Sequence, residues 1–100
     1  MTANEIIKQV ALKYRFLPEK LTAYGKYRPL VKARQEAWFR IVMETAYSTP
    51  RVARITGGFD HTSVLYGIRQ YSSRELGTPP KATLAEIRTA WEAQQIEVAA

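Results

Sequence analysis

The clearest indication of the fold of this 100-residue chain is the run Gly57-Gly58-Phe59-Asp60-His61-Thr62-Ser63-Val64-Leu65. Two adjacent glycines end a preceding helix, because glycine tolerates the positive φ of a tight turn. Asp60 can then cap the N-terminus of a new helix, whose apolar residues continue to Ile68. The run predicts a turn over residues 57–59 and a second helix from Asp60 to about Glu75.

The segment before this turn predicts a short helix from Thr49 to Thr56. Ser48 is a suitable N-cap, and Pro50 fits the first helical turn, where its missing N–H would be unpaired anyway. We expect Val52 and Ile55 to form the buried side of this helix. Two helices joined by a short glycine turn form the layout of a helix-turn-helix.

Further helices are predicted on both sides of this motif. A capping box of Thr2 and Glu5 starts the first helix, and a single turn follows over Pro18–Thr22. After a loop at Gly25, the longest helix is expected from Pro29 to about Tyr47. No segment alternates apolar and polar residues with a period of two, so the sequence predicts an all-α fold.

The run Gly77-Thr78-Pro79-Pro80 interrupts the helices. A second capping box, Thr83 with Glu86, then predicts an extra C-terminal helix that reaches Glu97. We therefore expect residues 1–76 to form the helix-turn-helix domain, and residues 77–100 to form a linker and a helix that packs on the domain or extends from it. The last helix could also dimerise, so we expect a monomer or a weak dimer.

The charge distribution points to a polyanionic partner. The formal net charge is +6, and twelve of the 15 lysines and arginines lie between Lys8 and Arg69. Five basic residues and no acidic residue lie between Lys20 and Gln35. A cationic surface of this kind suits nucleic acid, although surplus lysine can also serve solubility alone.

The composition excludes several classes of protein. The chain has no cysteine, which excludes disulfides and thiolate metal sites. No stretch approaches the roughly 20 apolar residues that a membrane span needs, and the N-terminus does not have the pattern of a signal peptide. We expect a cytoplasmic, nucleoid-associated protein with no membrane partner.

The start of the second helix has the chemistry of a DNA contact. A helix N-terminus presents free N–H groups and a partial positive charge, which attract phosphate. Short polar side chains there can reach base edges in the major groove, which is just wide enough for a helix. Asp60 can accept from cytosine N4, His61 can bond guanine or a phosphate, and the methyl group of Thr62 can pack on thymine.

The same residues resemble a known family. The run over residues 57–65, with Val31-Lys32-Ala33-Arg34-Gln35-Glu36-Ala37 upstream, is similar to the C-terminal DNA-binding domain of the bacterial replication initiator DnaA. That family has a Gly-Gly-Arg-Asp-His-Thr-Thr-Val signature and an Ala/Pro-Arg-Gln-x-Ala motif at this separation. The resemblance covers about Ile6 to Tyr71. It implies a Trp-repressor-like helix-turn-helix that binds short duplex sites known as DnaA boxes.

The matched motifs and the basic run give a set of candidate DNA-binding residues. They are Arg28, Lys32, Arg34, Gln35, Ser48, Thr49, Pro50, Asp60, His61, Thr62 and Ser63. The resemblance implies that residues 60–63 contact bases and phosphates, and that Arg28 enters the adjacent minor groove. It implies phosphate contacts for Arg34 and Gln35, and an approach to the DNA by residues 48–50.

The chain also departs from the family pattern. Phe59 stands where the family has arginine, Ser63 replaces threonine, and Thr56 replaces phenylalanine. The loop Gly25-Lys26-Tyr27-Arg28 has fewer cations than is usual there. Fewer phosphate contacts mean a shallower dependence on salt, and site preference could be relaxed or altered. We expect Phe59 to pack beneath the turn or to be exposed.

No residue pattern indicates catalysis. His61 is the only histidine, and the chain has no Gly-x-x-x-x-Gly-Lys-Ser/Thr loop for nucleotide phosphates. We expect no enzyme activity, no cofactor or metal, and no small-molecule substrate.

We therefore expect a free-standing or excised recognition domain that binds double-stranded DNA sequence-specifically and regulates transcription or replication without ATPase activity. One alternative is a protein–protein adaptor with a vestigial DNA face. Another is a binder of structured RNA, although the major groove of A-form RNA is too narrow for a helix.

Overall fold

The computed structural model describes residues 1–23 and 25–99, and within these residues it contains helices and no strand. The helices are α1 (Ala3–Tyr14), α2 (Pro18–Leu21), α3 (Arg28–Glu44), α4 (Thr49–Ile55), α5 (His61–Leu76) and α6 (Leu84–Ala99). The predicted all-α class is confirmed, and each helix lies where the sequence predicts one.

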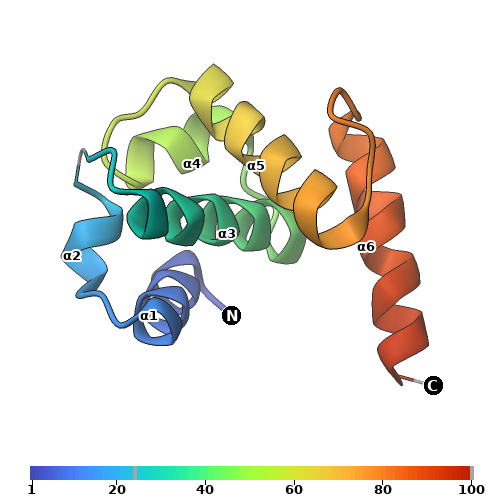
Figure 1. The fold of residues 1–100 in the computed structure, drawn as a ribbon, viewed down its shortest axis with the longest axis horizontal. Coiled ribbons are helices and arrows are strands. Elements are labelled where there is room, and N and C mark those ends of the chain that lie inside the picture. The colour runs from blue at the N-terminus through green and yellow to red at the C-terminus, as the bar shows by residue number, and fades with distance from the viewer. Residues whose placement is uncertain (24, 100) are drawn as a thin grey trace.

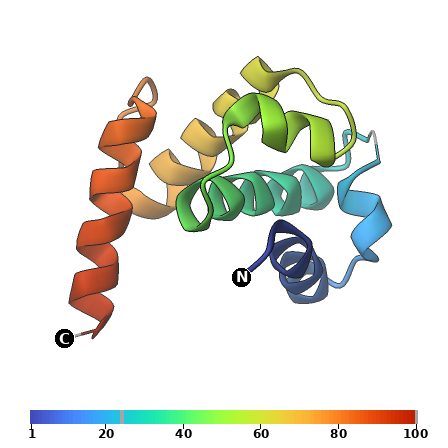
Figure 2. The ribbon, with the colours of Figure 1, turned by 180° about the vertical axis from the view of Figure 1, so that it is seen from behind.

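Helix α3 lies at the centre of the molecule (Figure 1). Helix α1 packs on one side of α3, and α4 and α5 cover the opposite side, as the view from behind also shows (Figure 2). The core is made of apolar side chains from one face of the outer helices and from the covered sides of α3, where Trp38, Phe39 and Met43 are all buried. Its fully buried large side chains include Ile6, Val10, Leu21, Ile41, Val52, Val64, Ile68 and Ile87.

The predicted helix starts at both ends of the chain are confirmed. In α1 the Thr2 hydroxyl accepts from the Glu5 N–H at 3.2 Å, and the Glu5 carboxylate accepts from the Thr2 N–H at 3.1 Å. Thr83 and Glu86 form the same reciprocal pair before α6. These bonds favour the charged carboxylates, so they lower the pKa of Glu5 and of Glu86.

Helix α3 ends earlier than the sequence predicts. The sequence predicts an end near Tyr47, whereas α3 stops at Glu44 because Thr45 adopts an extended backbone conformation. The Thr45 hydroxyl donates to the carbonyl of Ile41 and accepts from the N–H of Tyr47. A hydroxyl that bonds its own backbone in this way competes with continuation of the helix.

The buried face of α4 also differs from the prediction. Val52 is fully buried as expected, but Ile55 is 41% exposed. The other buried residues at this helix are Ala53 and Thr56. At 3.6 residues per turn, these three positions define a face that excludes Ile55.

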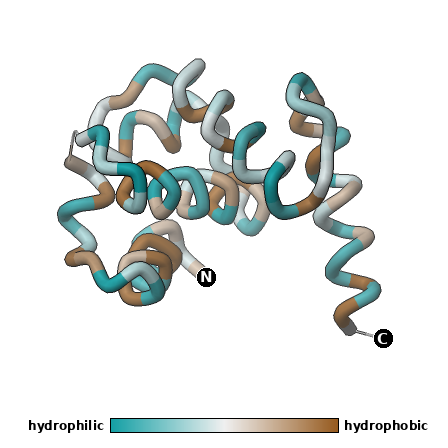
Figure 3. The backbone as a smooth tube through the Cα atoms, viewed as in Figure 1, coloured by the Kyte–Doolittle hydropathy of each residue, from teal (hydrophilic) through white to brown (hydrophobic). Residues whose placement is uncertain are grey.

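Helix α6 is attached to the body by its first half. Ile87 is fully buried, and the Arg88 guanidinium donates to the carbonyls of Val42 and Met43 at 2.8 and 3.1 Å. The second half of α6 extends away from the body (Figures 1 and 3). Ile96 and Val98 in this half are exposed.

Candidate nucleic-acid interface

The turn between α4 and α5 depends on its two glycines. Gly57 and Gly58 have φ values of 118° and 77°, which L side chains rarely adopt. The N–H groups of Gly58 and Phe59 both donate to the carbonyl of Ala53, at 3.0 and 3.1 Å, and so close the end of α4. A Cβ at residue 57 would also lie 2.2 Å from the carbonyl oxygen of Thr22. The turn therefore packs directly against the backbone at the end of α2.

The start of α5 is capped as predicted and open to solvent. The Asp60 carboxylate accepts from the N–H of Thr62 at 2.9 Å, and this bond lowers the pKa of Asp60. The Nδ1 atom of His61 lies 3.5 Å from the same carboxylate. The side chains of all four residues from Asp60 to Ser63 are exposed. The cap thus fixes the orientation of a polar helix end that a ligand can reach.

Helix α5 is held against α3 by a close contact that the sequence analysis did not use. Gly67 is buried, and a Cβ there would lie 2.7 Å from Cε3 of Trp38. The Trp38 indole N–H donates to the Thr56 hydroxyl at 2.9 Å. A glycine inside a predicted helix is the signal that could have indicated this approach.

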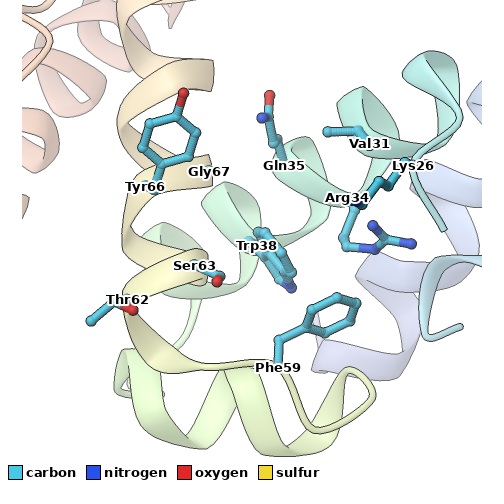
Figure 4. A pocket seen from close by; sticks show the side chains of 10 residues that line it. All are labelled: Lys26, Val31, Arg34, Gln35, Trp38, Phe59, Thr62, Ser63, Tyr66 and Gly67. Carbon is cyan, nitrogen blue, oxygen red and sulfur yellow. The ribbon is translucent and has the colours of Figure 1, made fainter. Parts of the chain in front are cut away.

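A groove of about 460 Å³ lies between α3 and α5, next to the loop before α3. Its walls include Gln35, Thr62 and Ser63 from the predicted set, together with Lys26 and Tyr66 (Figure 4). Lys26 is exposed, and the Tyr66 side chain is 62% exposed. The groove thus brings residues of α3, α5 and the loop to one surface.

Lys26 and Tyr66 were not among the predicted site residues. Lys26 belongs to the basic run without acidic residues, and Tyr66 lies three and four positions after Ser63 and Thr62. Residues at this spacing share one face of a helix. Both signals are visible in the sequence.

A second depression, of about 340 Å³, lies between α4 and the start of α5. Pro50 and Arg54 from α4 line it together with Asp60 and His61. Ser48 accepts from the N–H of Arg51 at 3.4 Å and so caps α4, as predicted. The first helix of the motif therefore presents Pro50 and Arg54 beside the start of α5.

Arg34 also lines the larger groove between α3 and α5, but it is largely buried. Its side chain is only 5% exposed, and its guanidinium donates to the carbonyls of Leu21, Ala23 and Gly25 at 3.1, 2.6 and 3.2 Å. The phosphate contact of Arg34 stays a prediction, and the partners of its guanidinium within the chain include backbone carbonyls of the segment that leads into the loop.

The remaining predicted residues divide by their exposure. Arg28 and Lys32 are exposed in the first turns of α3 and line neither depression. Gln35 is 8% exposed, and its side-chain oxygen accepts from Arg74 at 3.4 Å. Thr49 is half-buried at the start of α4. Gln35 can therefore offer a ligand only the edge that faces the larger groove.

No helix within residues 1–23 and 25–99 is long and apolar enough to cross a bilayer. The same residues include no group of three His, Asp or Glu side chains placed to hold a metal ion.

Comparison with known proteins agrees with the resemblance seen in the sequence. The family model described as the bacterial dnaA protein helix-turn-helix matches residues 3–70. The chromosomal replication initiator protein DnaA of Thermus thermophilus is 36% identical over 89 residues, which cover 89% of this chain and 20% of that protein.

Similar proteins of the same name occur in other bacteria. The DnaA of Brucella suis is 38% identical over 67% of this chain and 14% of its own length, and that of Magnetococcus marinus is 32% identical over 82% and 18%. The chain thus spans at most about a fifth of the length of these curated relatives. No solved structure matches the chain.

The family match covers α1 to α4, the glycine turn and α5 from its capped start as far as Gln70. The chain therefore belongs to the helix-turn-helix family of bacterial DnaA proteins, a family of DNA-binding domains.

Proposed function

We propose that this chain binds duplex DNA at specific sequences, with the start of α5 in the major groove. The observation that carries the proposal is the exposure of the four polar side chains at residues 60–63, on a capped helix N-terminus. Such an end attracts phosphate through its N–H groups, and its short side chains are the right length to reach base edges.

Arg28, the first residue of α3 after the loop, is proposed to contact the adjacent minor groove or its phosphates. One sugar-phosphate strand separates the two grooves of a duplex, so a protein that contacts both must accommodate that strand between its two contact points. The depression lined by Lys26, Gln35 and Tyr66 lies between the loop and α5 and is open to such a strand. Lys26 supplies a cation, and Gln35 and Tyr66 supply polar groups for phosphate oxygens.

We infer that the biological role is regulation of transcription or replication through occupancy of DnaA-box-like sites. The 100 residues contain no nucleotide-binding loop of the Gly-x-x-x-x-Gly-Lys-Ser/Thr type. The proposed activity is therefore DNA binding that needs no nucleotide hydrolysis by this chain.

The experiment compares binding to a duplex with a DnaA-box-like site and to a scrambled duplex of the same composition, at two salt concentrations. We expect tighter binding to the box-like duplex at both, with affinity falling as salt rises. His61→Ala should reduce the discrimination between the duplexes by about tenfold, if His61 contacts a base. Gln95→Ala, on the exposed part of α6, is the matched control and should bind as the parent chain does.

Equal affinity for the two duplexes would refute sequence specificity. Failure to bind either duplex at low salt would refute the DNA-binding proposal itself and would favour a protein partner. Unchanged discrimination by His61→Ala would refute the assignment of that residue.

A further inference from the structure

The two proposed DNA-contacting segments are far apart in sequence but adjacent in space. The loop that joins α2 to α3 and the turn that joins α4 to α5 lie side by side in both views of the ribbon (Figures 1 and 2). The backbone of Gly57 passes so close to the carbonyl of Thr22 that no side chain fits between them. The position of one segment therefore constrains the position of the other.

The place where these two segments meet, around Thr22 and Gly57, is called the junction. Arg34 organises the side of the junction that belongs to the loop before α3. Its three hydrogen bonds reach carbonyls at residues 21, 23 and 25, which are alternate positions along the segment that enters the loop. A planar guanidinium with donors in a fixed fork can span several acceptors, which a lysine ammonium cannot do in the same geometry. Arg34 thus sets the course of the backbone just before Lys26 and Arg28.

Phe59 supplies the turn side of the junction. The Arg34 guanidinium carbon lies 4.8 Å from the centre of the Phe59 ring, within the range of a cation–π contact. The same ring meets the indole of Trp38 edge-on, with centroids 5.2 Å apart (Figure 4). Phe59 directly precedes Asp60, the cap of α5. One side chain therefore connects the loop, the core and the start of the recognition helix.

We propose that Arg34 and Phe59 are positioning residues that fix the loop relative to the start of α5, so that both contact one duplex at the same time. This inference rests on the proposed function. It accounts for the phenylalanine at position 59, since a ring there can pack on the buried guanidinium, whereas a second cation would repel it. It offers an alternative to the phosphate contact that the sequence predicts for Arg34.

A double-mutant cycle tests the proposal. Binding to the box-like duplex is measured for Arg28→Ala alone, for Phe59→Leu alone and for both together, with thermal unfolding to verify that each variant is folded at the assay temperature. We expect Arg28→Ala to weaken binding about tenfold in the parent chain. In the Phe59→Leu background the same change should weaken binding to the duplex by less than about threefold, because a displaced loop no longer places Arg28 on the DNA.

Three further variants separate positioning from general stability. Phe59→Tyr keeps the ring, so in this background Arg28→Ala should again cause its full loss of affinity for the duplex. Tyr71→Leu removes a ring that packs on Phe39 at the far end of α5, and it should leave that loss unchanged. Arg34→Lys keeps the charge but loses the fork, so it should reduce the loss as Phe59→Leu does.

The proposal is overturned if Arg28→Ala costs the same in the Phe59→Leu background as in the parent chain. It is also overturned if Arg34→Lys binds as the parent does, which would indicate a simple charge contact. Failure of the parent chain to bind any duplex is a different result, and it would refute the proposed function rather than the junction alone.

Discussion

Gly67 of α5 lies so close to Trp38 of α3 that a Cβ at residue 67 would stand 2.7 Å from Cε3 and 2.8 Å from Cζ3 of the indole. The same indole donates its N–H to Thr56 at the end of α4. Trp38, a residue of α3, therefore contacts both helices of the helix-turn-helix: α5 at Gly67 and α4 at its C-cap, Thr56. The position of α5 relative to α3 therefore depends on the fit between Gly67 and the Trp38 ring.

Substitution of Gly67 should destabilise the fold. Gly67→Ala forces the Cβ against Trp38, and overpacking of this kind costs about 1–3 kcal/mol. The higher helix propensity of alanine offsets about 1 kcal/mol of this cost. Urea unfolding should show a net loss of stability. Ser73→Ala, a half-buried position on the same helix, should be nearly neutral. A Gly67→Ala chain as stable as the parent would show that α5 is not held by this contact.

The cap of α5 should contribute stability that depends on pH. The N–H of Thr62 holds the pKa of Asp60 below its ordinary value, so this contribution is present above the pKa of the unfolded state and is lost as pH falls through the lower folded pKa. Asp60→Ala should lower the urea midpoint at neutral pH, and Asp60→Asn, which keeps an acceptor, should lower it less. Equal midpoints for the parent and Asp60→Ala would contradict the capping role.

Two tyrosines should titrate late at alkaline pH. Burial raises the pKa of Tyr14 and of Tyr71 to about 12. The Tyr14 hydroxyl also donates to the buried carboxylate of Glu36 at 2.9 Å, which favours the neutral phenol. The associated stability is complete below the unfolded pKa near 10 and is lost as pH rises through about 12.

Ultraviolet titration of the phenolate should therefore show a late step, and Tyr14→Phe should reduce its amplitude. If every tyrosine ionised in one step near the ordinary value, the contact between Tyr14 and Glu36 would be wrong.

Removal of the anchor of α6 should affect stability but not DNA binding. Arg88 donates to two carbonyls at the end of α3, and hydrogen bonds of this charged type contribute about 1–2 kcal/mol when half-buried. Arg88→Ala should lower the midpoint of unfolding and increase hydrogen exchange in α6. Affinity for a box-like duplex should stay the same, as it should for the control Thr89→Ala. A weaker complex only for Arg88→Ala would assign α6 to the interface.

The sequence predicts those elements of this chain whose signals are local. Capping residues such as Thr2, Asp60 and Thr83 interact with backbone groups two or three positions away. Their pattern can therefore be recognised in the sequence without knowledge of the fold. Gly57 and Gly58 are equally local, since the turn itself requires their positive φ. The exposed start of α5 follows from these signals together with the apolar residues that continue the helix.

The missed features depend on contacts between distant segments. Arg34 lies in a basic run, and only the path of the loop shows that its partners are carbonyls thirteen, eleven and nine residues earlier. Ile55 is exposed because the buried face of α4 is set by where α3 and α5 lie. The contact between Gly67 and Trp38 joins two helices, so the periodicity of one helix alone cannot reveal it.

We propose that the start of α5 enters the major groove, and this placement can be measured directly. The chain has no cysteine, so a single Thr62→Cys variant can be tested for disulfide cross-linking to duplexes that carry one tethered thiol. We predict efficient cross-linking to a thiol on a major-groove base edge and little to one in the minor groove, with Gln95→Cys as a control that links to neither. Equal yields from Thr62→Cys and the control would contradict the placement of the start of α5 in the major groove. A cross-link to the minor-groove thiol alone would contradict it as well.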